Sequence, residues 1–143
     1  SFNFDTATIQ NCTDNNLVFK INDKELLLLS IPESSFLNEE TPDGSPRIIN
    51  VGTTNQIIYR LYSGNVSSAT ICSTLPPASP VVEKEWNASG GTIEIITDAL
   101  YDVDGITING YTHNIKFKNV NFSNPDNSFS FTEYIFGNYE TDL

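Results

Sequence analysis

Apolar side chains recur at every second position along most of this chain, and no segment of helical length carries an apolar stripe with a period of 3.6 residues. In residues 56–62, for example, Ile57, Tyr59 and Leu61 fall on one face. Successive side chains of a β-strand point to opposite faces, so this period predicts an all-β protein. The expected strands are 17–21, 26–31, 47–51, 56–62, 66–72, 92–97, the two arms of 106–118, and 128–136.

About eight short strands separated by turns favour an antiparallel β-sandwich, immunoglobulin-like or jelly-roll-like, with a lipocalin-like barrel as the alternative. We expect one domain over residues 1–143, because either half alone would bury too little surface. Residues 32–46 hold three prolines and four acids and are expected to form a mobile surface loop. Residues 73–80 hold three more prolines and are expected to form an extended crossover outside the sheet.

Two segments carry the sharpest local signals. The apolar run over Leu26–Ile31 predicts a strand that is buried on both faces. Asn109-Gly110 predicts a two-residue hairpin turn, which pairs Ile108 with Tyr111 and leaves 98–104 as an interstrand connection. That register places on one apolar face Ile106, Ile108, Tyr111, His113, Ile115 and Phe117. The polar end 138–143 is expected to fray.

Charge and hydropathy exclude some partners. The chain has 18 acidic and 7 basic residues and a net charge of −11, which repels nucleic acid and anionic lipid. No apolar run approaches the ~18 residues of a transmembrane helix, so no transmembrane segment is expected. The chain contains no Met and begins SFNFDTA, without a basic start and apolar stretch, so we expect a mature or trimmed form.

The two cysteines, Cys12 and Cys72, form an even pair in a chain rich in Asn, Ser and Thr. Such a pair favours a disulfide in an oxidising compartment, and two reduced thiols in a cytosolic core are the alternative.

Four stretches together resemble a known group: LVFKINDKELLLL, IYRLYSGNVSSATICSTLPPASPVVEKEW, NASGGTIEIIT and GYTHNIKFKNVNF. They are similar to uncharacterised secreted or outer-membrane lipoproteins of gut and gliding bacteria, over most of residues 12–123. In that group a lipidated cysteine precedes the folded domain. Cys12 lies inside the chain and does not match this anchor. The resemblance implies an extracytoplasmic location, a lipid anchor in the native precursor, and further support for the disulfide.

The stretch DALYDVDG, residues 98–105, suggests an ion site. Asp98, Asp102 and Asp104 could supply oxygen ligands to calcium, with Gly105 allowing a sharp turn. The spacing is only a fragment of an EF-hand loop, and Asp and Gly are also what an ordinary turn selects. A plain turn is therefore the leading interpretation and a weak structural calcium site the alternative; no other cofactor is expected.

Catalytic signals are sparse. His113 is the only histidine, and neither a nucleophile motif nor a phosphate-binding glycine pattern accompanies it, so we expect a histidine satisfied at the core edge. Glu83, Glu85 and Glu94 leave open a carboxylate-dependent glycoside hydrolase. We discount it, because nothing in the sequence raises a carboxylate pKa.

Aromatic residues suggest a ligand platform. Trp86, Tyr62 and Tyr101 could stack on sugar rings, although a single Trp is more commonly a core anchor. The sequence therefore favours a non-catalytic, extracytoplasmic or cell-surface binding or accessory module for an unknown glycan or protein. A structural subunit that pairs through a sheet edge is the alternative.

Overall fold

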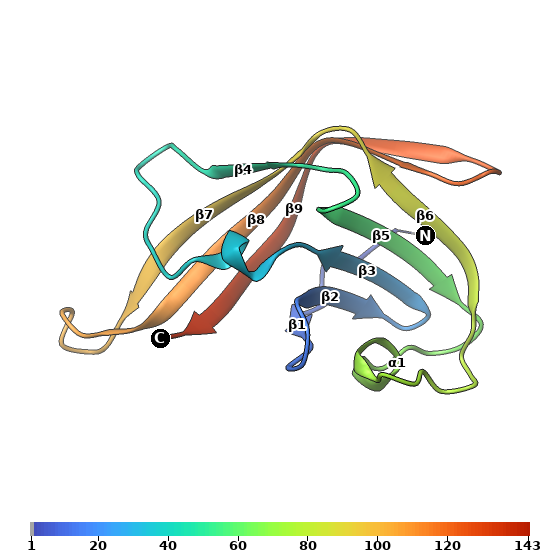
Figure 1. Ribbon diagram of the computed structural model, residues 1–143, viewed down its shortest axis with the longest axis horizontal. Helices are drawn as coiled ribbons and strands as arrows, with labels where there is room; N and C mark the ends of the chain where they lie inside the picture. The colour runs from blue at the N-terminus through green and yellow to red at the C-terminus, as the bar shows by residue number, and fades with distance from the viewer. Residues whose placement is uncertain (1) are drawn as a thin grey trace.

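The computed structural model describes residues 2–143 and shows an all-β protein (Figure 1). Over these residues, nine antiparallel strands form one sheet, with two short helices in the connections. The strands are β1 (Gln10–Asn11), β2 (Leu17–Asn22), β3 (Glu25–Ser30), β4 (Arg47–Asn50), β5 (Gln56–Tyr62), β6 (Val82–Ser89), β7 (Thr92–Tyr101), β8 (Ile108–Ser123) and β9 (Ser128–Asp142). The helices are the 3₁₀ helix η1 (Glu33–Phe36) and α1 (Ser68–Cys72).

The sheet folds over because β8 pairs with three strands. β9 runs along one side of β8, while β7 and β6 take successive parts of the other side. The resulting order is β1-β2-β3-β5-β6-β8-β7-β4, with β9 added on β8. This open sheet is bent into a sandwich-like arrangement, with β1, β2, β3, β5 and β6 in one part and β4, β7, β8 and β9 in the other (Figure 1). The fold class expected from the sequence is confirmed.

The bend lies at the turn between β6 and β7, at the point along β8 where its partner strand changes from β7 to β6. Gly91, in the β6–β7 turn, has a φ of +76°, and a Cβ there would lie 2.3 Å from the carbonyl oxygen of Lys118. Opposite it, Asn119 has a φ of +55° and interrupts the alternation of β8. Only glycine fits so close to another backbone in this conformation, so Gly91 allows the two parts of the sheet to meet.

The main core lies between the two parts of the sheet. Alternate residues of the facing strands fill it, and most are fully shielded from solvent. The expectation for β3 is confirmed: Leu27 and Leu29 enter this core, while Leu26 and Leu28 are buried on the opposite face. The main core contains Phe4, Val18, Leu27, Leu29, Ile31, Ile57, Tyr59, Trp86, Ile93, Ile95, Ile115, Phe117, Val120, Phe122 and Phe136.

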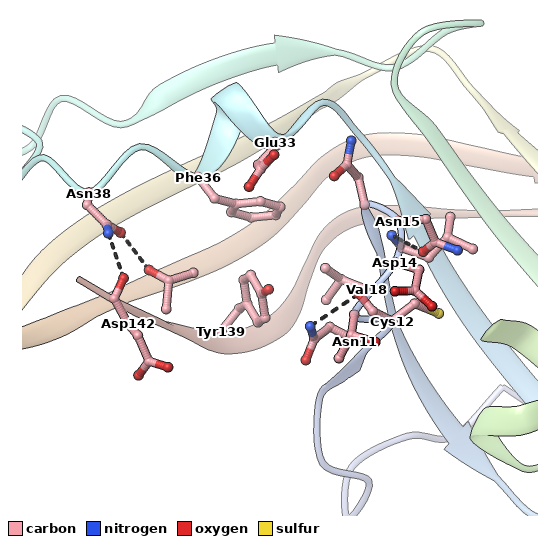
Figure 2. Close-up of a pocket in the computed structure, with 14 residues that line it drawn as sticks. Asn11, Cys12, Asp14, Asn15, Val18, Glu33, Phe36, Asn38, Tyr139 and Asp142 are labelled. Atoms are coloured by element: carbon pink, nitrogen blue, oxygen red, sulfur yellow. Dashed lines mark hydrogen bonds between the residues drawn. The ribbon is translucent and has the colours of Figure 1, made fainter.

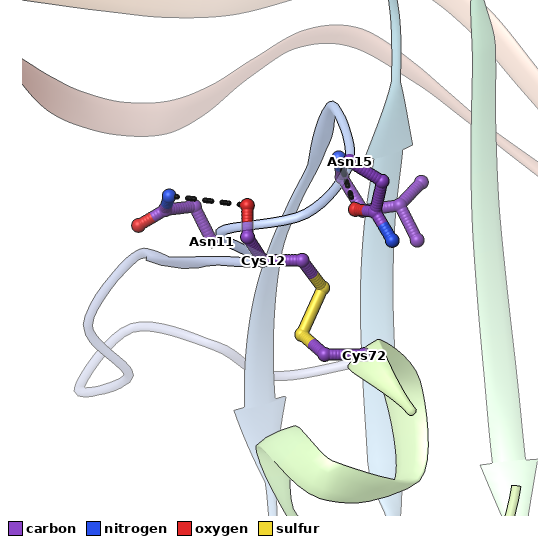
Figure 3. Close-up of a disulfide and its surroundings, with 5 residues drawn as sticks. Asn11, Cys12, Asn15 and Cys72 are labelled. Atoms are coloured by element: carbon purple, nitrogen blue, oxygen red, sulfur yellow. Dashed lines mark hydrogen bonds between the residues drawn. A yellow bond between two sulfur atoms is a disulfide. The ribbon is translucent and has the colours of Figure 1, made fainter. Parts of the chain in front are cut away.

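A second, smaller core covers the other face of β2, β3 and β5. Phe19, Leu26 and Leu28 pack there against Val66 and the region of α1. The Cys12–Cys72 disulfide joins the end of α1 to the β1–β2 connection (Figure 3), with the two Cα atoms 5.4 Å apart. The disulfide predicted from the sequence is thus confirmed.

The predicted strand over 66–72 is wrong, because residues 68–72 form the helix α1. The Thr70 hydroxyl accepts a hydrogen bond from the backbone N–H of Ser67 at 3.4 Å, a contact typical of a helix start. The disulfide at Cys72 holds the end of α1 against the second core. No helix within residues 2–143 is long and apolar enough to cross a membrane.

The predicted Asn109-Gly110 hairpin turn is also wrong. β7 extends through Tyr101, which pairs with Ile108, so the connection is 102–107 rather than 98–104. Gly110 instead lies inside β8, where a Cβ would be 2.5 Å from the carbonyl oxygen of Thr141. Consequently Ile106 is 80% exposed in the turn, whereas the inward positions expected for His113, Ile115 and Phe117 are confirmed.

Two segments are more ordered than the sequence suggests. Residues 138–142, which were expected to fray, form the end of β9 and pair with residues 110–114 of β8. In the proline-containing loop 32–46, η1 packs the half-buried ring of Phe36 against the main core. Residues 73–80 form no strand, as expected for a stretch with three prolines.

The disulfide should contribute strongly to stability. It closes a loop over a sequence separation of 60, for which the chain-entropy model gives about 4 kcal/mol. We expect the double variant Cys12→Ser/Cys72→Ser to lose about that much free energy of unfolding in urea titrations. Dithiothreitol should destabilise the wild type and leave the double variant unchanged. Equal stability of the two proteins under oxidising conditions would contradict this assignment.

Candidate functional site: a polar groove

A groove of about 400 Å³ opens where three segments far apart in the sequence meet. The first is the β1–β2 connection with the start of β2, the second is η1 and the residues just after it, and the third is the end of β9. Its volume lies within the range of small-molecule binding sites. We call it the polar groove; it is lined by residues 11–18, Glu33, Phe36, Asn38, Tyr139, Thr141 and Asp142.

Two aromatic rings lie between the polar walls (Figure 2). Phe36 and Tyr139 are both half-buried, and their ring centroids are 5.0 Å apart in an edge-to-face arrangement. Burial raises the pKa of the Tyr139 hydroxyl, and the negative charge of Glu33 raises it further. The phenol therefore stays protonated at neutral pH and can both donate and accept a hydrogen bond.

The β1–β2 wall is almost entirely polar. Asn11, Thr13, Asp14, Asn15 and Asn16 are all exposed. Asn15 Oδ1 accepts a hydrogen bond from the backbone N–H of Leu17 at 3.0 Å, which fixes the turn. Cys12 lies beneath this wall, so the disulfide anchors it to α1 (Figure 3). The wall thus offers amides, a hydroxyl and a carboxylate from a covalently anchored loop.

The other end of the groove is held by a continuous row of hydrogen bonds. Asn38 donates from Nδ2 to the Asp142 carbonyl oxygen at 2.7 Å, and the Thr141 hydroxyl donates to Asn38 Oδ1 at 2.7 Å. Behind them, His113 Nε2 lies 2.9 Å from Thr141 Oγ1. We call this row, from Asp142 through Asn38, Thr141, His113 and Thr97 to Arg47, the hydrogen-bond chain.

The chemistry of its two ends sets the direction of the hydrogen-bond chain. A carbonyl can only accept, so Asn38 turns its NH₂ toward Asp142 and its oxygen toward Thr141. Thr141 Oγ1 then accepts the Nε2–H of His113. In the neutral ring, Nδ1 is left as an acceptor, and the Thr97 hydroxyl donates to it at 2.7 Å.

Arg47 ends the hydrogen-bond chain and fastens the loop that carries Asn38. Its Nη1 donates to Thr97 Oγ1 at 2.7 Å, and its Nη2 donates to the carbonyl oxygens of Glu39 at 2.6 Å and Leu37 at 3.3 Å. One guanidinium on β4 therefore joins β7 to the segment that follows η1. These hydrogen bonds hold the irregular segment after η1 in place, so that it can form one wall of the groove.

The sequence-predicted acidic residues of the 98–105 stretch do not converge. Asp98 lies in β7 opposite Thr112, outside the turn. Asp104 Oδ1 accepts the backbone N–H groups of Ile106 and Thr107, and its Oδ2 accepts the Thr107 hydroxyl. These bonds, the Thr107 hydroxyl foremost, lower the pKa of Asp104. Within residues 2–143, no group of three or more acidic, His or Cys side chains is placed to hold a metal.

The aromatic platform expected from the sequence is divided among three places. Trp86 is buried in the main core, stacks on Tyr59 and donates its Nε1–H to Asn127 Oδ1 at 2.7 Å. Tyr62 is buried in the second core, on the opposite face of the sheet. Tyr101 is 52% exposed at the far end of β7. These three rings therefore do not form a common surface.

Glu94 is also separated from the other two candidate glutamates. Glu83 and Glu85 lie on β6, which does not pair with β7, the strand of Glu94. Glu85 forms an ion pair with Arg60 at 2.6 Å, and Glu94 lies opposite Lys116 in the sheet. His113 is fully buried and bonded at both ring nitrogens, as expected for a satisfied core-edge histidine.

Sequence reasoning did not find the groove. Its residues come from positions 11–18, 33–38 and 139–142, segments far apart in the sequence that meet only in the folded protein. The density of Asn and Asp in 11–16 was the one available signal, and it is equally typical of a turn.

The chain matches no protein-family model, no curated protein and no solved structure.

Acid should weaken the fold through His113. Burial, together with the smaller effect of the nearby positive charge of Arg47, lowers the pKa of this histidine to about 4. The unfolded chain takes up this proton below about pH 6.5, whereas the folded protein does so only near pH 4. The contribution of His113 to the free energy of unfolding is therefore fully present above pH 6.5. It is lost as the pH falls from 6.5 to about 4, by about 3 kcal/mol in total.

Urea unfolding of the wild type and of His113→Gln at pH 7 and pH 4.5 tests this prediction by measuring the free energy of unfolding. Carboxylate titration affects both proteins alike, so the difference between them isolates the histidine. The wild type should lose more stability than the variant on acidification. Equal losses in the two proteins would show that the ring does not control the pH response.

Proposed function

We propose that this protein is a non-catalytic binding module that acts outside the cytoplasm and holds a hydroxyl-rich ligand, a glycan, in the polar groove. The observation that carries the proposal is the composition of the groove. It combines two half-buried aromatic rings, Phe36 and Tyr139, with amide, hydroxyl and carboxylate side chains on the walls around them. Sugar rings stack their apolar faces on aromatics and use their hydroxyls for hydrogen bonds.

The location follows from the covalent structure and the charge. A disulfide such as Cys12–Cys72 in a small domain persists in oxidising compartments and supports an extracytoplasmic site of action. A net charge of −11 disfavours nucleic acid and anionic lipid as partners. A position at the cell surface through a lipid anchor rests on the family resemblance.

The alternative of assembly through a sheet edge is less favoured by the structure of β9. This strand pairs only with β8 among the described strands, so its outer edge is open to strand addition. However, the register shifts at Gly137, and Glu133 and Glu140 place charges along the strand. Bulges and charges of this kind protect natural edge strands from pairing.

Tyr139→Ala tests the proposal most directly. Loss of a stacking ring should weaken glycan binding roughly two- to tenfold, as judged from typical aromatic contacts. The measurement is a glycan array followed by calorimetry on the glycans that bind. Tyr101→Ala removes an exposed tyrosine outside the groove and should leave affinity unchanged.

Asp14→Asn provides a second variant that should not disturb the fold, because Asp14 is exposed on the groove wall. It should weaken binding without changing the melting temperature. If Tyr101→Ala weakened binding while the two groove variants did not, the site would lie elsewhere. Turnover of a glycan by the wild type would replace the binding proposal with an enzymatic one.

A further inference from the structure

A second hollow, of about 430 Å³, adjoins the polar groove. The two share Asn11 and Tyr139, so Tyr139 stands between them. The second hollow is bounded by residues 7–9, by Lys20 of β2 and by residues 137–140 of β9. We call it the Lys20 hollow. A ligand chain that lies in the groove can continue past Tyr139 into it.

Lys20 is unusual among the basic residues of this acidic protein. Only 8% of its surface is exposed, and its ammonium lies 5.4 Å from the centroid of the Phe136 ring. Nζ would also lie 3.7 Å from a Cβ built on Gly137, which places it beside the β9 backbone. In residues 2–143, Lys20 has no hydrogen bond and no ion pair; the charge of Asp5 reaches it only from beyond ion-pair distance.

The Lys20 side chain is largely buried and lacks a charged partner, and its ammonium keeps contact with solvent at the hollow, because no fully buried side-chain nitrogen in residues 2–143 lacks a hydrogen bond. Lysine is rarely buried unless it is paired, because removing the ammonium from water is costly. Burial lowers the pKa of Lys20, and Asp5 offsets this only in part. A cation–π contact returns a fraction of the lost solvation. An anionic group in the hollow would compensate for the remainder of the lost solvation.

The surroundings of Lys20 suit one small oxyanion. Thr8 provides a hydroxyl at the hollow. Asn138 Oδ1 accepts a hydrogen bond from Asn114 Nδ2 at 3.0 Å, which leaves the side-chain NH₂ of Asn138 available as a donor. Glu140 also lines the hollow, and the protein carries a net charge of −11, so a multiply charged group is disfavoured. A single carboxylate fits these limits better than a phosphate.

We propose that the Lys20 hollow binds the carboxylate of a sugar acid, so that the protein selects acidic glycans over neutral ones. This inference rests on the proposed glycan-binding function and narrows its ligand class. Within the polar groove itself, Asp14, Glu33 and Asp142 accept hydrogen bonds from hydroxyls and disfavour a second carboxylate. The acid group of the ligand is therefore directed past Tyr139 to Lys20.

Calorimetry with a trisaccharide of two neutral sugars and one terminal galacturonate, and with the methyl ester of that galacturonate, tests the inference, because esterification removes the single negative charge. The wild type should bind the acid at least about tenfold more tightly, as one charge-assisted contact is worth. Lys20→Met keeps the apolar stem and should remove this preference. Lys84→Met makes the same change of net charge at an exposed site on β6 and should retain it.

Equal affinity of the wild type for acid and ester would overturn the carboxylate site and leave the glycan function standing. Retention of the preference in Lys20→Met would overturn it too. If neither trisaccharide binds, nuclear magnetic resonance with galacturonate and with galactose decides. Galacturonate-specific shifts at residues 7–9 and 137–140, absent in Lys20→Met, would keep the carboxylate site and count against the glycan function. No such shifts would refute the site.

Discussion

The architecture depends on the pairing of one long strand with three others. β8 joins β7 and β6 along one side and β9 along the other, so among the described strands the pairing of β8 with β6 joins the two parts of the bent sheet. The main core lies between those parts, and the polar groove forms where β9 approaches the β1–β2 connection. Loss of the β8 ladder would therefore remove the core and the candidate site together.

Sequence patterns predicted the elements whose structure is decided locally or by burial. The period-two alternation in 17–21 and 56–62 corresponds to β2 and β5, and the apolar run 26–29 corresponds to a strand buried on both faces. The inward face of β8 was also predicted, since His113, Ile115 and Phe117 alternate with polar residues. In each case, the apolar side chains alone determine which face of the strand is buried, whatever its partner strand.

The failures arose where a distant segment overrode a local preference. Asn109-Gly110 has the intrinsic geometry for a tight turn, yet Gly110 is needed inside β8 because the Thr141 backbone comes too close for any side chain. The carboxylate of Asp104 stabilises the actual turn through hydrogen bonds within it. The groove was beyond prediction for a related reason: its walls come from three distant segments, and the position of the third, the end of β9, depends on its register on β8.

The hydrogen-bond chain supports the groove, and it also has a fixed direction from donor to acceptor. Every donor in it points the same way, from the guanidinium of Arg47 toward the carbonyl of Asp142. Neither end can reverse, because a guanidinium has no acceptor and a carbonyl has no proton. The imidazole in the middle is thus locked in one tautomer. It behaves as a fixed architectural part of the protein and is unsuited to carry protons.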